Sequence, residues 1–321
     1  MIKFKLVCGS RMRSFQNKAT LITGAASGIG REIAIQMGNQ GARLGLLDRN
    51  EESLRELSIE LSKKGVENYP IICDLGDQNS IPFIKPVVER HLGNLEILIN
   101  NAGIGLHGPT HELTDHERNH VLQVNLNAPF QLFQLFIHEL LNAKGGQLVN
   151  VSSFLGLVPQ AQTTAYSVSK YGLVGLTESL RAEYSRWGLG VTLICPGFVQ
   201  TPLIENLPTV SKNGQKLKHP PKWLTTTPQK IASQTVAAMK RNRRLVVSTG
   251  LAKFLYTAKR LLPGTFDFIQ TFQSSKIKRL LGFGKSTANS DKAGSDPRKD
   301  FENPDLENPD LENSRHRRNA A

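Results

Sequence analysis

The sequence contains little of what disulfide-stabilised or membrane-spanning proteins need. Its 321 residues include only three cysteines, Cys8, Cys73 and Cys195, at wide and unpaired spacings. We therefore expect a protein of a reducing compartment, without a disulfide framework. No apolar run approaches the roughly 18 residues of a transmembrane helix. The basic start of the chain has no apolar core long enough for a signal peptide. These features predict a cytoplasmic protein.

Acidic residues are scarce in one long stretch of a chain whose net charge is +13. Between Arg241 and Lys285, ten lysines and arginines accompany a single acid, Asp267. Such a stretch can meet nucleic acid, anionic lipid or acidic ligands, or it can simply be a solvated basic face. No nucleic-acid-binding motif appears, so we predict no nucleic-acid partner. Peripheral attachment to an anionic membrane surface stays open.

Motifs for metal binding are also missing. His116 and His120 have the i, i+4 spacing of metal ligands on a helix, and His107 and His111 are close in sequence. The chain has no H-E-x-x-H sequence, and a solvated helix start accounts for these histidines. We predict no metal site.

Apolar, β-branched runs alternate with stretches of helical length along most of the chain. The runs predict seven buried strands, over Ala19–Thr23, Arg43–Leu47, Tyr69–Cys73, Ile97–Ile99, Gln147–Val151, Val191–Ile194 and Leu245–Val247. Helices are expected between them, for example over Arg31–Gln40, Glu51–Lys64 and Lys170–Trp187. This alternation predicts an α/β fold in which a Rossmann-type, doubly wound parallel sheet of seven strands carries helices on both faces.

Composition divides the chain into four segments. A basic N-terminal segment (residues 1–18) precedes a single Rossmann-type domain (residues 19–250). Within that domain, the stretch from Thr201 to Thr227 is rich in Pro, Lys and Asn and is expected to form a loop over a ligand. An amphipathic basic extension (residues 251–284) follows, and then a polar, near-repetitive tail (residues 285–321) that we expect to be disordered.

Apolar residues in the extension have helical spacing. One face collects Leu251, Phe254, Leu255, Ala258, Leu261 and Leu262, and a second candidate helix carries Phe268, Ile269, Phe272, Ile277 and Leu280. We hypothesise that these helices pack beside the mouth of the ligand site, with basic residues turned outward: Lys253, Lys259, Arg260, Lys276, Lys278 and Arg279. Either the apolar face completes the protein core, or it lies in a membrane interface and is attracted by anionic lipid.

A glycine-rich segment follows the first expected strand and opens the first helix. It reads T-G-A-A-S-G-I-G and contains Thr23, Gly24, Ser27, Gly28, Ile29 and Gly30. Glycines let the backbone turn tightly and approach phosphate closely, and the free N–H groups at a helix N-terminus attract pyrophosphate. In this strand–loop–helix setting, the G-x-x-x-G-x-G spacing predicts a dinucleotide site.

The residue that ends the second strand indicates which dinucleotide binds. The carboxylate of Asp48 can accept hydrogen bonds from the adenosine ribose hydroxyls and repel a 2′-phosphate, which favours NAD(H). The guanidinium of Arg49 could instead hold that phosphate, so NADP(H) stays open.

Tyr166 and Lys170 stand four residues apart in Y-S-V-S-K, a spacing that places both on one helix face. A free tyrosine has a pKa of about 10 and is a poor acid or base at neutral pH. A neighbouring ammonium favours the phenolate, so we expect Lys170 to lower the pKa of Tyr166. A proton donor tuned in this way suits carbonyl reduction and alcohol oxidation.

These segments together resemble the classical short-chain dehydrogenase/reductase family. The resemblance runs in order from about Ala19 to Val247. It comprises the glycine segment, Asp48, the pair Asp74 and Leu75, the segment N-N-A-G with Asn101, Ala102 and Gly103, and then Asn125, V-S-S ending in Ser153, Y-S-V-S-K, and P-G-F-V-Q-T from Pro196 to Thr201.

The resemblance implies a role for each position. Tyr166 is the expected general acid/base, Ser153 binds the substrate oxygen, and Lys170 lowers the pKa of Tyr166 and binds the nicotinamide ribose. Asn125 is expected to position a water that links Lys170 to solvent. The remaining residues are expected to line the cofactor (Asp74, Leu75, Asn101, Ala102, Gly103, Pro196, Gly197, Val199 and Thr201) or the substrate (Phe198 and Leu203). Of the two adjacent serines, family spacing selects Ser153 over Ser152.

The predicted function is hydride transfer between NAD(P) and a secondary alcohol or ketone. The apolar, basic extension loosely resembles those of members that act on lipids, retinoids or steroids, so an apolar substrate is expected. Family members commonly pair through the helices after Asn125 and after Tyr166, which suggests a homodimer or homotetramer. The alternative is a cofactor-binding regulatory or membrane-associated interaction protein with little turnover. The complete set of Asn125, Ser153, Tyr166 and Lys170 argues against that alternative.

Overall fold

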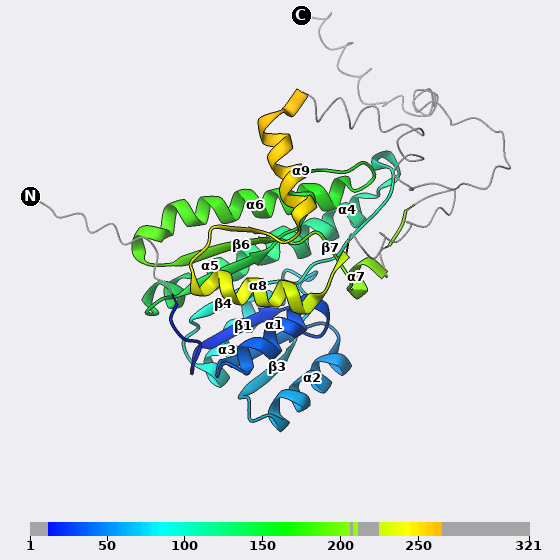
Figure 1. Ribbon diagram of the computed structural model, residues 1–321. Helices are drawn as coiled ribbons and strands as arrows, with labels where there is room; N and C mark the ends of the chain where they lie inside the picture. The colour runs from blue at the N-terminus through cyan, green and yellow to red at the C-terminus, as the bar shows by residue number, and fades with distance from the viewer. Residues whose placement is uncertain (1–11, 206–207, 211–224, 265–321) are drawn as a thin grey trace, which may run out of the picture. The chain divides into compact units, whose positions relative to one another are not determined.

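Seven parallel strands form the central sheet of the computed structural model, which describes residues 12–205, 208–210 and 225–264 (Figure 1). Their spatial order is β3-β2-β1-β4-β5-β6-β9. The strands are β1 Ala19–Thr23, β2 Arg43–Asp48, β3 Asn68–Ile72, β4 Ile97–Asn100, β5 Gln147–Val151, β6 Gly190–Cys195 and β9 Leu245–Val247. A separate short ladder joins β7 (Phe198–Val199) to β8 (Thr225–Thr226). The predicted sheet is confirmed, with strand ends that differ by one residue where they differ.

Helices cover both faces of this sheet (Figure 1). They are α1 Gly28–Gly38, α2 Glu51–Lys63, α3 Ile84–Leu92, α4 Asp115–Leu122, α5 Ala128–Asn142, α6 Thr164–Tyr184, α7 Pro202–Glu205, α8 Pro228–Lys240 and α9 Gly250–Leu261. Apolar residues of α1, α2 and α8 form the core on one face, and those of α3, α5 and α6 form the core on the other. Burial on both faces explains why the strands are continuous apolar runs.

The strand order reverses between β1 and β4, which lie side by side at the centre of the sheet. In open α/β sheets this switch point opens a crevice at the carboxyl ends of the strands, where ligands bind. The glycine segment follows β1, and the N-N-A-G segment follows β4. The topology therefore brings these two sequence motifs to one place.

Helix α6 begins earlier than its sequence pattern predicts. The stretch expected over Lys170–Trp187 begins instead at Thr164, and the helix carries both Tyr166 and Lys170, as the spacing of Y-S-V-S-K predicts. Burial of Ala165, Ser167 and Ser169 stabilises this first part of the helix, in which only Ala165 has a strong helical preference of its own. The helix ends at Tyr184, where a 3-10 turn over Ser185–Trp187 continues the chain.

Helix α9 corrects two expectations about the extension. Leu251, Phe254 and Leu261 are exposed, whereas Ala252 is buried against the domain. Leu255 and Ala258 of the expected apolar face are half-buried, so only part of that face packs against the domain in the described part of the extension. Lys259 was expected to point outward, but its ammonium donates a 3.0 Å hydrogen bond to the carbonyl of Leu157.

Several predicted segments lie outside the described residues. They are residues 1–11, most of the stretch from Thr201 to Thr227, the second candidate helix of the extension, and the tail. Within the part that the structure describes, no helix has the length and apolar character to cross a membrane.

Candidate active site

The loops after β1 and β4 are tied together by a compact hydrogen-bond network. The hydroxyl of Thr23 accepts from the amides of Asn101 and Ala102, both at 3.0 Å. The Asn101 side-chain amide donates in return to the carbonyls of Thr23 (3.0 Å) and Gly24 (3.1 Å). Thr23 and Asn101 therefore hold the glycine segment at a fixed distance from the N-N-A-G segment.

Three glycines in the first loop meet backbone constraints that other residues cannot meet. Gly24 and Gly28 have positive φ angles, +65° and +53°. A Cβ on Gly30 would lie 2.1 Å from the Gly24 carbonyl oxygen, closer than any real contact. Helix α1 begins immediately after Ser27, whose side chain makes no capping hydrogen bond. The first amides of α1 are therefore available to an anion, and Ile29 anchors the turn by packing against the core.

Acidic side chains lie at the ends of β2 and β3. The Asp48 carboxylate accepts from the amides of Ala26 and Asn50, both at 3.0 Å. Asp74 accepts from the Gly76 amide at 2.8 Å, and Leu75 beside it is buried. A groove of about 780 Å³ runs past Arg49, Asn50 and Asp74, among other residues.

Ser153 and Tyr166 meet where β5 ends and α6 begins. Ser153 follows β5 by two residues, and its hydroxyl accepts from the Leu155 amide at 3.1 Å. Burial raises the pKa of the Tyr166 hydroxyl, and a hydrogen bond with Ser153 opposes that rise. The expected lowering of this pKa by Lys170 does not appear, because loss of hydration outweighs the other influences on the hydroxyl.

Lys170 is an almost fully buried lysine with 3% of its surface exposed. Its ammonium donates to the Val151 carbonyl at 3.1 Å and lies 5.8 Å from the centroid of the Tyr166 ring. Burial lowers the pKa of Lys170 to about 8. The ammonium therefore still carries most of its charge at pH 7, close to the phenol.

A π-helical turn over Gln123–Asn127 places Asn125 beside this pair. The Asn125 side chain accepts from the Ile104 amide (2.8 Å) and donates to the Ile104 carbonyl (2.9 Å) and the Ser169 hydroxyl (3.0 Å). A Cβ on Gly103 would lie 3.2 Å from both the Asn125 side-chain oxygen and the Lys170 nitrogen. Asn125, Lys170 and the N-N-A-G segment are therefore in one cluster.

The segment after β6 closes the cluster from the side of the glycine loop. The Pro196 carbonyl accepts from the Phe154 amide at 2.7 Å, which ties this segment to the β5 loop. The Thr201 methyl group lies 3.0 Å from the position of a Cβ on Gly28. The rest of the segment comprises half-buried Gly197 and Phe198, buried Val199, and Leu203 on α7 with an exposed side chain.

Comparison with known proteins decides the family. The sequence profile described as short chain dehydrogenase matches residues 18–211. The chain belongs to the short-chain dehydrogenase family. It is accordingly an oxidoreductase that acts on alcohol or ketone groups with NAD or NADP.

Relatives of this short-chain dehydrogenase extend over most of the chain. Dehydrogenase/reductase SDR family member 7B of Bos taurus is 29% identical over 284 residues, which are 86% of this chain and 87% of that one. A metagenomic short-chain oxidoreductase solved with NADP is 30% identical, with a TM-score of 0.60 over 73% of this chain and 99% of that one. A Burkholderia phymatum member solved with NAD has a TM-score of 0.69, covers 87% of this chain and 100% of its own, and is 22% identical, so it supports the fold alone.

Two supporting serines of this short-chain dehydrogenase were not predicted as site residues. The Ser169 hydroxyl accepts a hydrogen bond from the Asn125 side-chain amide and donates one to the Tyr166 carbonyl at 2.7 Å. Ser152, which family spacing does not select, donates to the Lys170 carbonyl at 2.9 Å. Both are small polar residues beside predicted site residues in buried elements, and that is the signal that could have found them.

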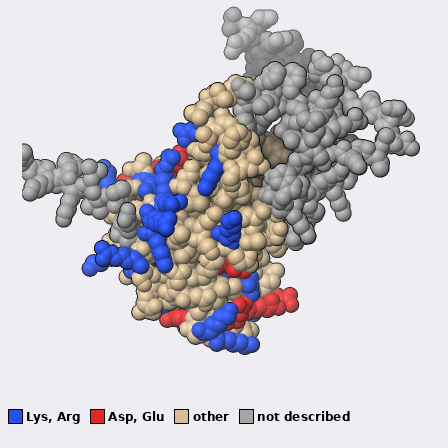
Figure 2. Space-filling view, in the orientation of Figure 1, with Lys and Arg blue, Asp and Glu red and all other residues tan. Residues whose placement is uncertain are grey.

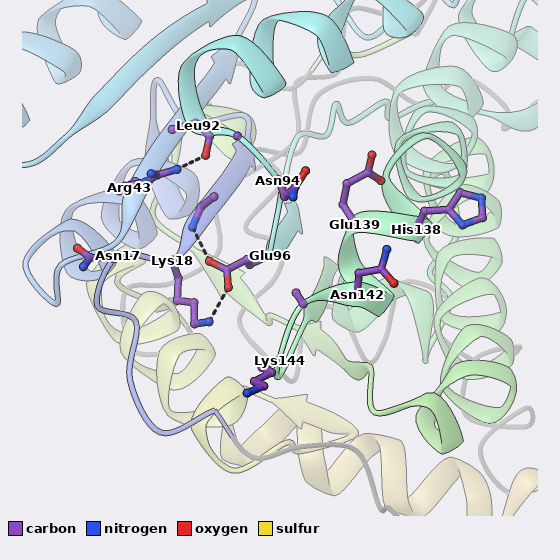
Figure 3. A pocket seen from close by; sticks show the side chains of 13 residues that line it. Asn17, Lys18, Arg43, Leu92, Asn94, Glu96, His138, Glu139, Asn142 and Lys144 are labelled. Carbon is purple, nitrogen blue, oxygen red and sulfur yellow. Dashed lines mark hydrogen bonds and ion pairs between the residues drawn. The ribbon is translucent and has the colours of Figure 1, made fainter.

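Two other features lie apart from this cluster. The imidazole rings of His116 and His120 stack with their centroids 6.2 Å apart. Among the described residues, no group of three or more metal-ligating side chains forms. A pocket of about 750 Å³ opens where β1 and β2 begin, at the opposite edge of the sheet (Figure 3). An ion pair between Lys18 and Glu96 crosses it at 2.5 Å, and none of the predicted site residues lines it.

Proposed function

We propose that Tyr166 transfers the proton in a reversible ketone reduction, with Ser153 and Lys170 beside it. The observation that carries this proposal is the convergence of Ser153, Tyr166, Lys170 and Asn125 next to the glycine loop. The raised pKa of Tyr166 keeps its hydroxyl protonated at neutral pH, so it can donate to a substrate oxygen. The Ser153 hydroxyl lies within reach of that oxygen and stabilises its developing charge.

The dinucleotide fits the site because the glycine loop leaves no room for a side chain at Gly30 and keeps the α1 amides free. When bound, its nicotinamide supplies or accepts the hydride. In this proposal the α1 amides and Ser27 hold the pyrophosphate, Asp48 the adenosine ribose, and Asp74 and Leu75 the adenine. The segments over Asn101–Gly103 and Pro196–Thr201 hold the nicotinamide half.

Lys170 and Asn125 complete the proton path in this proposal. The charged Lys170 binds the nicotinamide ribose and favours deprotonation of Tyr166 as the proton leaves. Asn125 orients a water that returns the proton to Lys170 from solvent. The hydrogen bonds of Asn125 to both backbone groups of Ile104 support this positioning role, because they fix the side chain.

We favour NAD(H) over NADP(H) as the cofactor. The Asp48 carboxylate is held by two amides at the end of β2, where it would repel a 2′-phosphate. Arg49 is exposed beside it and would favour NADP(H), and a 30% identical relative has been solved with NADP. Competitive binding to the wild-type protein tests the preference. Tighter binding of NADPH than NADH would overturn it.

The substrate we propose is an apolar secondary alcohol or ketone of lipid-, retinoid- or steroid-like character. Phe198 and Leu203 present apolar side chains beside the proposed nicotinamide site, which supports this class. Absorbance of NAD(P)H at 340 nm with a panel of apolar and polar ketones tests both reaction and class. Faster turnover of polar sugars would reject the apolar class. No absorbance change with any ketone or alcohol would favour the regulatory alternative.

A homodimer or homotetramer is proposed from two exposed apolar side chains. Phe130 on α5 and Val168 on α6 are both solvent-exposed, on helices that cover the same face of the sheet. Pairing of two copies through α5 and α6 would bury them. Light scattering should therefore give a dimer or tetramer mass, and Phe130→Asp should lower it. A monomeric wild type would exclude this proposal.

Attachment to an anionic membrane is supported by α9. Leu251, Phe254, Leu261 and Leu262 are exposed, and Lys253 and Arg260 are exposed on the same helix. In Figure 2 more basic than acidic side chains are visible across the middle of the face, and most acidic ones lie at its lower end beside further basic ones. Phe254→Ser should reduce sedimentation with phosphatidylserine vesicles at low salt. Equal binding by neutral vesicles, or none to either, would contradict it.

A further inference from the structure

The loop after β4 makes a short parallel bridge with the segment that follows α7. The His107 amide donates to the Pro208 carbonyl at 3.0 Å, and the His107 carbonyl accepts from the Val210 amide at 2.8 Å. The approach is close, because a Cβ on Gly108 would lie 2.4 Å from the Val210 carbonyl oxygen. Both backbone groups of His107 are therefore fixed.

The same loop is also joined to the start of α6. The Gly108 amide donates to the Gln162 carbonyl at 2.8 Å, four residues before Tyr166. The hydroxyls of Thr110 and Thr164 hydrogen-bond at 2.7 Å. His107 consequently stands where three segments meet, from β4, from α6 and from the chain beyond α7.

The His107 side chain is buried but lacks a full set of partners. Only 9% of its surface is exposed, and its Nδ1 has no hydrogen-bond partner among the described residues. Leu106 and Val210 pack with Ala165 in an apolar cluster. Burial lowers the pKa of His107, which leaves the ring neutral at pH 7, with one donor and one acceptor nitrogen.

We propose that His107 lines the substrate cleft and hydrogen-bonds a second oxygen of the substrate, away from the reacting carbon. A buried polar atom without a hydrogen-bond partner lowers the stability of the folded protein. In a site that recognises a ligand, the ligand supplies the missing partner when it binds. This inference rests on the proposed ketone reduction and narrows its substrate class. The substrate is a largely apolar ketone that carries a further hydroxyl, carbonyl or ester oxygen.

Two ketones of one carbon skeleton test the inference. One is a bicyclic monoketone, and the other is its diketone. We expect wild-type kcat/KM to favour the diketone by about 10- to 100-fold, as is typical of a site with a polar group to satisfy. His107→Leu should abolish the preference, mainly through a higher KM for the diketone, because the bond is remote from the reacting carbon.

Matched variants separate recognition from structure. His111→Leu changes an exposed histidine four residues away and should keep the preference. His107→Gln retains a hydrogen-bond donor and an acceptor, so this variant should keep most of the preference for the diketone. If His107→Leu does not fold, the nearly isosteric His107→Phe replaces it. Equal rates for the two ketones in the wild type, or an unchanged preference in the Leu or Phe variant, would overturn the inference alone. Turnover of neither ketone by the wild type would overturn the proposed function with it.

Discussion

Removing the buried charge of Lys170 should change how the stability of the protein depends on pH. Burial lowers the pKa of Lys170 from 10.5 to about 8 in the folded protein. Between those values the unfolded chain holds a proton that the folded protein releases, so stability rises with pH in that window. Below pH 8 the lysine is protonated in both states, and the cost of burying its charge is fully present.

The size of the effect follows from the shift. A change of about 2.5 pKa units corresponds to about 3 kcal/mol, of which about 2 kcal/mol falls between pH 7 and pH 10. Lys170→Met removes this contribution. The wild type should therefore gain about 2 kcal/mol more free energy of unfolding than the variant when the pH is raised from 7 to 10.

Urea denaturation of both proteins at pH 7 and pH 10 measures this double difference. Other groups that titrate in this range, including Cys195 and Tyr166, are present in both proteins, so their contributions to the double difference largely cancel. Lys63→Met, on the exposed side of α2, serves as the control and should leave the pH dependence unchanged. A double difference near zero, or one of opposite sign, would refute the burial argument for Lys170.

Three further outcomes are expected. Gly30→Ala should lower the free energy of unfolding by about 1–3 kcal/mol and weaken dinucleotide binding, because its Cβ would lie 2.1 Å from the Gly24 carbonyl oxygen. Gly175→Ala is the control, because a Cβ there would meet no atom within 4 Å. Equal changes in the calorimetric stability of the two variants would contradict this prediction. Because the pKa of Tyr166 is raised and that of Lys170 is about 8, both groups keep their protons from pH 6 to 7, so ketone reduction should be nearly constant over that range while alcohol oxidation rises with pH. An oxidation rate that falls from pH 6 to 7 would count against this assignment. Asp48→Ala should weaken NADH binding and relax the exclusion of NADPH, and fluorescence titrations that show an unchanged NADH/NADPH ratio would reject the role of Asp48.

The sheet and the position of the site could be predicted from sequence because both depend on local patterns. Strands buried on both faces are continuous apolar runs, so β1 and β5 are predicted with their observed bounds. The order of motifs along the chain fixes which loops reach the switch point. The spacing of Tyr166 and Lys170 predicts that one helix carries both, but the first residue of that helix, Thr164, could not be predicted, since burial of Ala165 and Ser167 stabilises its start.

The pKa shifts and buried polar contacts of the site could not be predicted from the sequence. Spacing alone suggested that Lys170 would lower the pKa of Tyr166, but burial of the phenol has the larger effect. The expected outward direction of Lys259 was wrong, because its ammonium donates a hydrogen bond to the Leu157 carbonyl. Among the described residues the Nδ1 of His107 has no hydrogen-bond partner, and because its surroundings come from three segments distant in sequence, no local pattern shows this.

The measurement closest to the central claim is the turnover of Tyr166→Phe with an accepted ketone and its preferred reduced dinucleotide. The variant keeps the ring and removes only the hydroxyl whose proton the proposal assigns to the substrate. We predict a fall in kcat of about 10²- to 10⁴-fold, as expected for a positioned acid/base, with dinucleotide affinity nearly unchanged in a fluorescence titration. A variant that retains near-wild-type kcat would contradict the assignment of Tyr166 as the proton donor.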